Sequence, residues 1–172
     1  MEEVAARAGL AVGTLYNYFP SKSALLLAIL RRETQSLLAR GQKILDAPGR
    51  DPVAVVFAFT EIFLDDFMRE DRGLWRAMFG AAIAEPGVVG RRLFEADAQL
   101  VTQLATLFDR YRGSGVLEGD IESTSAAIVL YGVCFTWMTA YLMNDEITAA
   151  MVRDEIRRGV AIAIRGLFPR EA

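Results

Sequence analysis

The side chains of this sequence best suited to molecular recognition are a group of hydroxyl and amide residues near its start. A threonine, two tyrosines and an asparagine lie close together and are followed by a lysine: Thr14, Tyr16, Asn17, Tyr18 and Lys22. These polar side chains are short or planar, and they can form hydrogen bonds with phosphate oxygens and with the edges of bases. The group therefore offers the chemistry of nucleic-acid recognition, provided that a helix presents it.

The sequence lacks the parts of common catalytic and metal sites. It contains no histidine, the commonest general base and the commonest metal ligand. Cys134 is the single cysteine and lies in a long apolar run, so neither a disulfide nor a thiolate cluster is available. Asp65 and Asp66 are neighbours that point in different directions on a helix. We therefore predict no catalytic residue, no metal site and no cofactor, in a protein that is not an enzyme.

Residues 4–26 predict the helices that present the polar group. Ala5 marks the inner face of a first short helix, and Gly9 permits a sharp turn with positive φ. Leu15 marks the inner face of a second helix, expected over residues 11–18. Ser21 can cap a third helix. The pattern is that of a helix-turn-helix whose second helix carries the polar residues.

Within this segment, the run AGLAVGTLYNYFPSKSALL resembles the DNA-binding segment of the TetR (tetracycline-repressor-type) family of bacterial transcription regulators. The order Ala-Gly, Gly-Thr-Leu-Tyr, Tyr-Phe, Ser-Lys and Leu carries the resemblance. It implies a homodimeric repressor whose partners are a double-stranded DNA operator and a small effector. It also implies DNA contacts by seven residues: Val12, Gly13, Thr14, Tyr16, Asn17, Tyr18 and Lys22. For Tyr18, a place in the core remains the alternative.

The start of the sequence departs from the usual layout of that family. Family members carry another helix before this segment, whereas here Met1 already lies in the helix before the turn. Without that helix, the side chains of Val4, Leu15 and Phe19 are expected to be only partly covered. Two functions therefore stay open: a regulator that binds DNA, and a ligand-binding dimeric helical module that does not bind DNA because its first helix is missing.

The composition indicates a chain that buries more apolar surface than its own core requires. Of 172 residues, 53% are hydrophobic, and the mean hydropathy is +0.25, above that of an ordinary soluble protein. We expect a partner subunit or an apolar ligand cavity to use this excess. The net charge of -3 argues against nonspecific coating of nucleic acid, but it permits a few local phosphate contacts. The acidic start shows no signal peptide, which favours a cytoplasmic protein.

Apolar spacing predicts an all-α fold with two domains, a helix-turn-helix domain over residues 1–30 and a ligand-binding and dimerisation domain over residues 31–172. After the first two helices, we expect helices over residues 21–47, 52–70, 74–84, 89–112, 121–144 and 148–167, with Asp120 as a cap and a break at residues 85–87. The uncharged run over residues 123–144 is long enough to span a membrane. Its serine, threonine and asparagine residues and its lack of a basic flank favour a buried helix and no membrane partner.

Aromatic and methionine residues are abundant on the helices from Pro52 onward, where members of the TetR family hold their effector. The candidate ligand-binding residues are Phe59, Phe63, Trp75, Met78, Phe79, Leu104, Phe108, Tyr131, Phe135 and Met138. For any one of them, ordinary core packing is the alternative. Because no histidine and no convergent acidic cluster is apparent, we expect an apolar or aromatic ligand held mainly by burial and tyrosine hydroxyls.

The last expected helix carries an apolar stripe with small residues at its middle. Its members are Val152, Ile156, Gly159, Val160, Ala163 and Leu167. Small side chains allow two helices to approach closely. We therefore expect a homodimer built from the last two helices, with this stripe at the interface.

Overall fold

The computed structural model describes residues 1–47, 49, 51–69, 71–114 and 120–167, with side chains described as far as Ile164. Within these ranges every regular element is a helix, which confirms the all-α prediction. The elements in chain order are α1 (Glu2–Arg7), α2 (Val12–Tyr18), α3 (Lys22–Asp46), α4 (Pro52–Arg69), α5 (Arg72–Ala84), the π-helical turn η1 (Pro86–Gly90), α6 (Arg91–Gly113), α7 (Ser123–Met143) and α8 (Ala149–Leu167).

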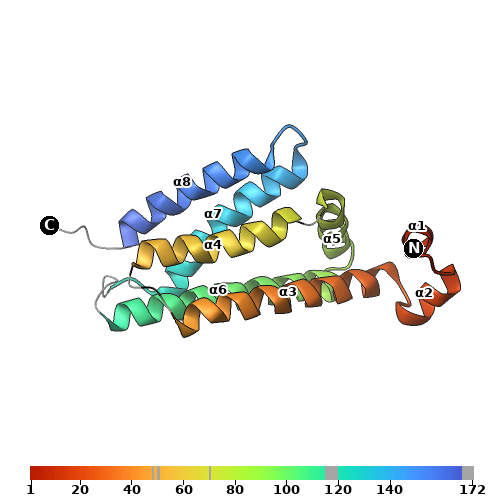
Figure 1. Cartoon of the computed structure of the whole chain (residues 1–172), viewed down its shortest axis with the longest axis horizontal. Coiled ribbons are helices and arrows are strands. Elements are labelled where there is room, and N and C mark those ends of the chain that lie inside the picture. Colours follow the sequence, from red (N-terminus) through yellow and green to blue (C-terminus); the bar gives the residue numbers. More distant parts are fainter. Residues whose placement is uncertain (48, 50, 70, 115–119, 168–172) are drawn as a thin grey trace.

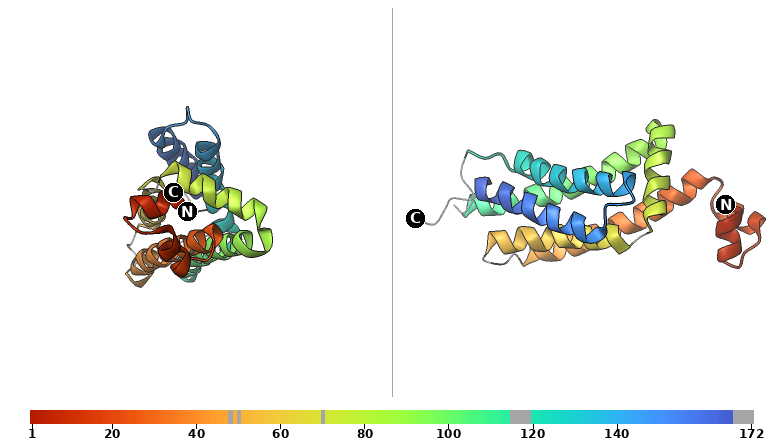
Figure 2. Two further views of the ribbon diagram at one scale, coloured as in Figure 1. Left: turned by 90° about the vertical axis from the view of Figure 1, so that its right-hand side faces the viewer. Right: turned by 90° about the horizontal axis from the view of Figure 1, so that it is seen from above.

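The helices form a small head and an elongated body joined by one long helix. Figure 1 shows α1 and α2 at one end of the molecule, apart from the other helices, with α3 leading from them into the body. In the body, α3 packs against α6 and α4, α7 packs against α6 and α8, and α5 lies across the end nearest the head (Figures 1 and 2). Because α3 is continuous, the expected boundary between residues 30 and 31 falls inside a helix.

Short-range interactions set the helix boundaries. Gly9 has a φ of 67°, which provides the left-handed turn predicted between the first two helices. The Ser21 hydroxyl accepts a hydrogen bond of 3.0 Å from the backbone N–H of Ala24 and so caps α3. Asp71 caps α5 in the same way, through a 2.7 Å bond from the N–H of Gly73. These local signals explain why most of the expected helices begin close to where the sequence places them.

Two of the expected boundaries differ in detail. The cap of α7 is Glu122 and not Asp120, because the Glu122 carboxylate accepts hydrogen bonds from the N–H groups of Thr124 (2.9 Å) and Ser125 (2.6 Å). The same two bonds lower the pKa of Glu122 to about 2. The break expected at residues 85–87 is shorter: only Glu85 separates α5 from the π-helical turn η1, which begins at Pro86 and runs directly into α6.

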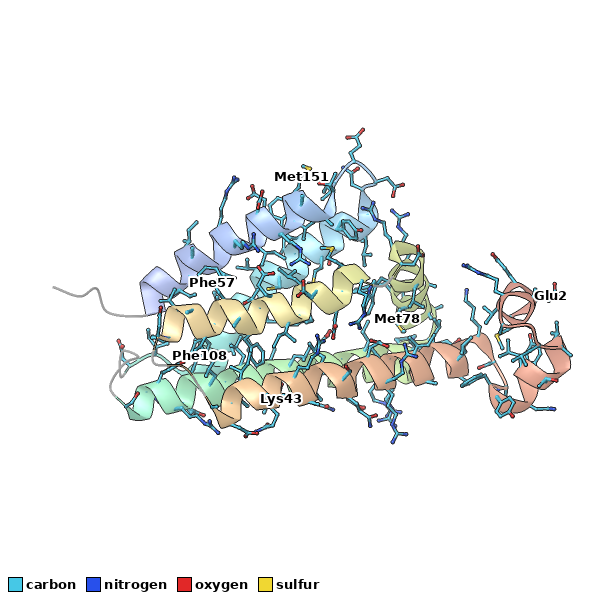
Figure 3. The ribbon with its side chains drawn as sticks, viewed as in Figure 1. Glu2, Lys43, Phe57, Met78, Phe108 and Met151 are labelled. Atoms are coloured by element: carbon cyan, nitrogen blue, oxygen red, sulfur yellow. The ribbon has the colours of Figure 1, made fainter. Side chains whose placement is uncertain are left out.

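The buried side chains form two clusters. The main core lies between α4, α6, α7 and α8, where Leu64, Leu107 and Phe108 are fully buried. A second, smaller core joins the first half of α3 to α5, η1 and α6, and Met78 belongs to it (Figure 3). The second core attaches α5 to the part of α3 that leads to the head.

The apolar stripe of α8 lies inside the chain and does not face outward. Val152, Ile156 and Val160 are fully buried in the main core. A Cβ atom added at Gly159 would lie 2.6 Å from Cγ1 of Val133, so this glycine permits close packing against α7 of the same chain. Ala163 also packs against the main core, and the side chain of Leu167 lies outside the described residues. This placement corrects the interface residues expected from the sequence.

The surfaces of α7 and α8 that remain exposed carry other apolar side chains. Ile128 and Val129 on α7 are each 55% exposed, and Ile162 on α8 is 71% exposed. Of the described helices, α7 alone is long and apolar enough to cross a membrane, a criterion that core helices of soluble proteins also meet. Leu130, Cys134 and other residues of α7 belong to the main core.

Candidate functional site

The outer face of α2 presents its polar side chains to solvent. Tyr18 is 73% exposed and Tyr16 is 46% exposed, while Leu15 on the opposite face is buried. The other residues expected to contact DNA are also accessible: Val12, Gly13, Asn17 and Lys22 are exposed, and Thr14 is half-buried. Within the described residues the Tyr18 ring therefore lies outside the core.

The inner side of the head is held by a small contact. Ala5 is fully buried, and its carbonyl accepts a 2.9 Å hydrogen bond from the N–H of Leu10, which closes the turn. Leu15 is buried as well, more fully than the sequence led us to expect, because α1 and α2 pack against each other. Val4 is 42% exposed and Phe19 is half-buried. Part of the apolar surface of the head is therefore uncovered within the described chain.

The charges near α2 are compatible with a phosphate backbone. The helix itself, VGTLYNY, carries no ionisable acid or base other than its tyrosines. Lys22 is the first residue of α3 and is exposed beside the end of α2. A neutral hydrogen-bonding face with a lysine at its edge can approach DNA without repelling the phosphates.

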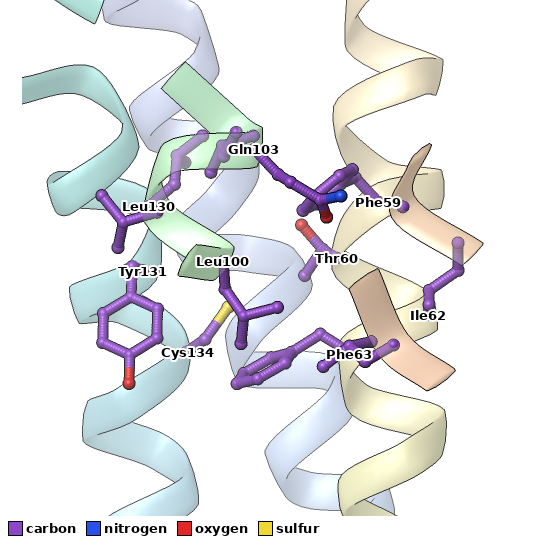
Figure 4. Close-up of a pocket in the computed structure, with 13 residues that line it drawn as sticks. Phe59, Thr60, Ile62, Phe63, Leu100, Gln103, Leu130, Tyr131 and Cys134 are labelled. Atoms are coloured by element: carbon purple, nitrogen blue, oxygen red, sulfur yellow. The ribbon is translucent and has the colours of Figure 1, made fainter. Parts of the chain in front are cut away.

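Two neighbouring cavities lie in the body. The far cavity is formed by α3, α4, α6 and α7 around Gly41, Phe59 and Gln103, and it holds about 40 Å³ of free space (Figure 4). The near cavity lies closer to the head, is also lined by α5, and holds about 60 Å³. Four side chains line both cavities: Leu37, Phe63, Leu100 and Tyr131.

Aromatic rings line much of the near cavity. The rings of Tyr131 and Phe135 are stacked with centroids 5.9 Å apart, and Phe63 and Phe79 extend this row at 6.2 Å on either side. Trp75 also lines the cavity, with its indole N–H bonded at 3.0 Å to the carbonyl of Phe67. The rings come from α4, α5 and α7, so a ligand here touches three helices at once.

Most of the expected ligand-binding residues border one of these cavities. Phe59 and Leu104 line the far cavity, and Phe63 and Tyr131 line both. Trp75, Phe79, Phe135 and Met138 line the near cavity. Met78 and Phe108 border neither, because they fill the small core and the main core respectively (Figure 3).

Three carboxylates converge on the near cavity, contrary to the expectation that no acidic cluster exists. Glu33 from α3, Asp66 from α4 and Asp97 from α6 all line it. Each acid occupies a position of its helix that otherwise belongs to the apolar face; Asp97, for example, lies between Leu93 and Leu100. That interruption of the apolar spacing is the signal in the sequence that could have revealed them.

The three acids differ in their partners. Asp66 is buried and pairs with Arg40 and, at 3.0 Å, with Arg69, which also contacts Glu33 at 3.2 Å. Asp97 makes no ion pair within the described part of the chain, and the Tyr131 hydroxyl lies near its carboxylate. Burial raises the pKa of Asp97 to about 6, and burial together with the nearby Asp97 raises the pKa of Tyr131.

A close contact between helices forms the far side of the body cavities. A Cβ atom at Gly41 of α3 would lie 2.4 Å from Oε1 of Gln103 and 3.1 Å from the ring of Phe59. The Gln103 side chain crosses from α6 and donates a 2.9 Å hydrogen bond to the carbonyl of Leu38 (Figure 4). Gly41 therefore lets α3 lie directly against α4 and α6 at this point.

Comparison with known proteins bears on both parts of the chain. Residues 1–29 match the family described as bacterial regulatory proteins, tetR family. The HTH-type transcriptional repressor KstR of Rhodococcus jostii (strain RHA1) is 51% identical over 53 residues, which make up 31% of this chain and 24% of that repressor. The match thus spans about a quarter of the repressor's length.

Solved structures resemble the whole fold. The TetR-family repressor FadR of Thermus thermophilus, solved in complex with lauroyl-CoA, is 26% identical with a TM-score of 0.70, covering 99% of this chain and 86% of that one. A TetR-family regulator from Mesorhizobium loti has a TM-score of 0.73 at 18% identity, and the match covers 98% of this chain and 86% of that one. The head of this chain thus matches the bacterial regulatory proteins of the tetR family, and the whole fold resembles that of TetR-family regulators.

Proposed function

We propose that this protein is a homodimeric transcriptional repressor that works in the cytoplasm, binds operator DNA through α2, and releases it when a small apolar or aromatic molecule enters the body cavities. Residues 1–30 would bind DNA, and residues 31–172 would bind the effector and form the dimer. The likeness of 53 residues of this chain to KstR, a repressor, supports repression and not activation.

The observation that carries this proposal is the outward-facing side of α2. Tyr16, Asn17 and Tyr18 are exposed on a head that projects from the body, while Leu15 fixes the opposite face of the helix. A short helix presented in this way can enter a major groove, with Lys22 placed for the phosphates at its edge.

The cavities support a small effector. They are bordered mainly by apolar and aromatic side chains, and they hold room for only a few water molecules. A larger molecule must therefore separate the helices that line them. FadR of Thermus thermophilus has a similar fold and is known in complex with lauroyl-CoA, which supports a body of this kind as a container for apolar molecules.

The contacts of α5 give a route from the cavities to the head. Trp75 and Phe79 of α5 line the near cavity, and Met78 between them packs on the first half of α3. At the end of α5, Glu85 accepts a 2.6 Å hydrogen bond from the hydroxyl of Ser23 at the start of α3. Movement of α5 by a ligand would therefore act on the segment that carries the head.

The exposed sides of α7 and α8 support dimerisation. Ile128, Val129 and Ile162 are exposed apolar residues on neighbouring helices. Association of two such surfaces about a twofold axis would remove them from water and set the separation of the two heads.

A second candidate function is a dimeric ligand-binding module that does not hold DNA. The exposure of Val4 and Leu10 favours it, because a head with uncovered apolar side chains is held less firmly. A head that changes position freely would bind an operator weakly.

One titration separates the two functions. We expect the protein to bind the region upstream of its own gene more tightly than unrelated DNA in fluorescence anisotropy at fixed salt, and a cavity ligand to weaken that binding. A folded dimer that binds hydrophobic ligands, yet treats operator and unrelated DNA alike, would exclude the regulator and support the module.

A further inference from the structure

The near cavity contains one carboxylate that the chain does not neutralise, and this inference rests on the effector site proposed above. Asp66 and Glu33 have arginine partners: Arg40 and Arg69 for the first, Arg32 and Arg69 for the second. Asp97 has none within the described residues, although most of its surface is withdrawn from water. With a pKa of about 6, it is largely ionised at neutral pH, and an unpaired charge withdrawn from water is unfavourable.

The hydrogen-bonding groups around the cavities point to the same kind of ligand. The hydroxyl of Thr60, the amide of Gln103 and the indole N–H of Trp75 each donate to a carbonyl of the chain, those of Val56, Leu38 and Phe67. The Thr34 hydroxyl also lines the near cavity and can either donate or accept. The Tyr131 hydroxyl lies near the Asp97 carboxylate, which can accept its proton. Acceptors, in contrast, remain open: Oε1 of Gln103 is buried without a partner among the described residues. The lining thus favours a ligand that brings donors of its own.

The aromatic row complements a positive charge. Tyr131 lies near the Asp97 carboxylate and stacks on the ring of Phe135. Phe63 and Phe79 continue the row on either side. A cation is attracted to the face of an aromatic ring within about 6 Å of its centroid, and more strongly in a site withdrawn from water.

We propose that the effector is an organic ammonium, with its charged nitrogen at Asp97 in the near cavity and its apolar or aromatic body along Phe63, Tyr131 and Phe135. The nitrogen supplies the missing countercharge and the hydrogen-bond donors. The body takes the space that opens as the side chains between the two cavities move apart. A carboxylate of the same shape is disfavoured, because it would meet the ionised Asp97 with like charge.

Four compounds that share one phenylbutyl body test the charge separately from the shape. They are 4-phenylbutylamine, pentylbenzene, 4-phenylbutanol and 5-phenylpentanoate, titrated into the purified dimer at about pH 7.5 by calorimetry. We expect the amine to bind at least about tenfold more tightly than pentylbenzene and 4-phenylbutanol, and the carboxylate to bind most weakly. Equal affinity of the amine and the alcohol would overturn the proposal.

Two variants assign the effect to one residue. Asp97→Asn is expected to abolish the preference for the amine while it keeps the affinity for pentylbenzene. The matched control is Glu95→Gln, which removes the same charge from α6 at a residue that does not line the near cavity and is expected to keep the preference. If the Asp97→Asn variant also keeps the preference for the amine, the ammonium is not at Asp97.

The affinity of the wild-type protein for the amine, measured as a function of pH, tests the proposal without any substituted variant. The amine stays charged between about pH 5 and pH 8, so its affinity should fall as Asp97 is protonated below a pH of about 6. The other titratable groups that line this cavity are Glu33, Asp66 and Tyr131, and the first two have arginine partners. An affinity that is constant across this range contradicts the proposal.

The outcomes also distinguish this proposal from the effector site itself. If pentylbenzene binds and weakens the operator complex while the amine has no advantage, the effector site stands and the ammonium assignment fails. If none of the four compounds binds the folded protein, the ammonium assignment fails, whereas the effector site fails only if apolar and aromatic molecules of other sizes do not bind either.

Discussion

Lys22 and Asn17 are both exposed on the proposed DNA-binding head but offer different chemistry. A lysine at the edge of the head is suited to a phosphate, which is the same in every sequence. An asparagine on the exposed face of α2 can bond to the edge of a base, above all adenine. The two residues should therefore contribute to affinity and to specificity, respectively.

We expect Lys22→Ala to weaken binding to operator and to unrelated DNA alike, and to lower the slope of log affinity against log salt by about 1. Asn17→Ala should weaken operator binding by about 1–3 kcal/mol and bring it closer to that of unrelated DNA. Anisotropy titrations at several salt concentrations measure both effects. The control is Lys43→Ala, which removes an exposed lysine from the other end of α3 (Figure 3); an equal loss in this variant would contradict a local phosphate contact.

The raised pKa of Asp97 predicts how the stability of the fold changes with pH. Its pKa in the folded chain is about 6, above the ordinary aspartate value of 3.8, so the folded state binds the proton more tightly than the unfolded state. Stability should then fall as the pH rises from about 4 to about 6, by at most about 3 kcal/mol. The pKa of Glu122 is lowered from 4.5 to about 2, so this residue acts in the opposite sense: its contribution to stability grows as the pH rises from about 2 to about 4.5.

Asp97→Asn should remove this decline and should leave the protein more stable than the wild type above a pH of about 6. Urea unfolding between about pH 4 and pH 7 gives the comparison, with Glu95→Gln as a control that keeps the wild-type profile. Parallel profiles for Asp97→Asn and wild type would show that the carboxylate is not buried as described.

At the scale of single elements, α5 connects the near cavity to α3 at two points. Met78 packs in the small core, and the hydrogen bond from Ser23 to Glu85 joins the start of α3 to the end of α5. Because neither Ser23 nor Glu85 lines either body cavity or lies on α2, both are suited to testing transmission without disturbing a binding site.

We expect Ser23→Ala to leave effector affinity unchanged and to reduce the effect of a bound effector on DNA affinity by about 1 kcal/mol, the contribution of one hydrogen bond. The measurement is the DNA dissociation constant with and without saturating effector. Arg92→Ala, which breaks an exposed ion pair within α6, is the control. If Ser23→Ala keeps the full response, transmission does not pass through this contact.

The elements with local signals were predictable from the sequence. Gly9 and Ser21 identified the turn and a helix start because their own backbone and side-chain geometry determines them. The cap of α7 was assigned to the wrong acid, since Asp120 and Glu122 both precede the apolar run and only the fold decides which carboxylate reaches the free N–H groups. The π-helical turn η1 carries no signal that separates it from an ordinary bend.

The spacing of apolar residues predicted which faces of the helices are buried, but not what each face packs against. Spacing identified the apolar faces that carry Phe63 and Phe135, but it could not tell cavity from core, so Met78 and Phe108 were included although they fill cores. It found the stripe of α8 but not its neighbour, which is α7 of the same chain. Asp97 was missed because the convergence of three helices is not visible along the sequence.

At the scale of the whole molecule, the exposed apolar sides of α7 and α8 predict which substitution would prevent the proposed dimer from forming. We expect Ile162→Glu to give a folded monomer, because the twofold axis places an unpaired carboxylate in the interface twice, at an energetic cost of about 3 kcal/mol or more. This corresponds to a loss of affinity of about 100-fold. Sedimentation at micromolar concentration measures it.

Ile83→Glu is the matched control for that prediction, since Ile83 is 80% exposed on α5 and should keep the dimer. Gly159→Glu should behave differently, because a side chain there collides with Val133 and lowers the melting temperature of the chain itself. A wild-type protein that sediments as a monomer, or an Ile162→Glu variant that remains a dimer, would place the interface elsewhere.

The continuity of α3 has a mechanical consequence. This helix runs unbroken from the edge of the head into the body. At Gly41 it cannot shift without moving Phe59 and Gln103, so a tilt of the helix would pivot about this contact. The arm from Gly41 to Ser23 is about 27 Å long at about 1.5 Å per residue, so a tilt of about 5° moves the head end by about 2 Å. In a twofold dimer both arms swing at once, and the gap between the two heads changes by up to about twice that amount. A small opening of a cavity would thus change the distance between the two heads, so that they no longer match the spacing of successive major grooves.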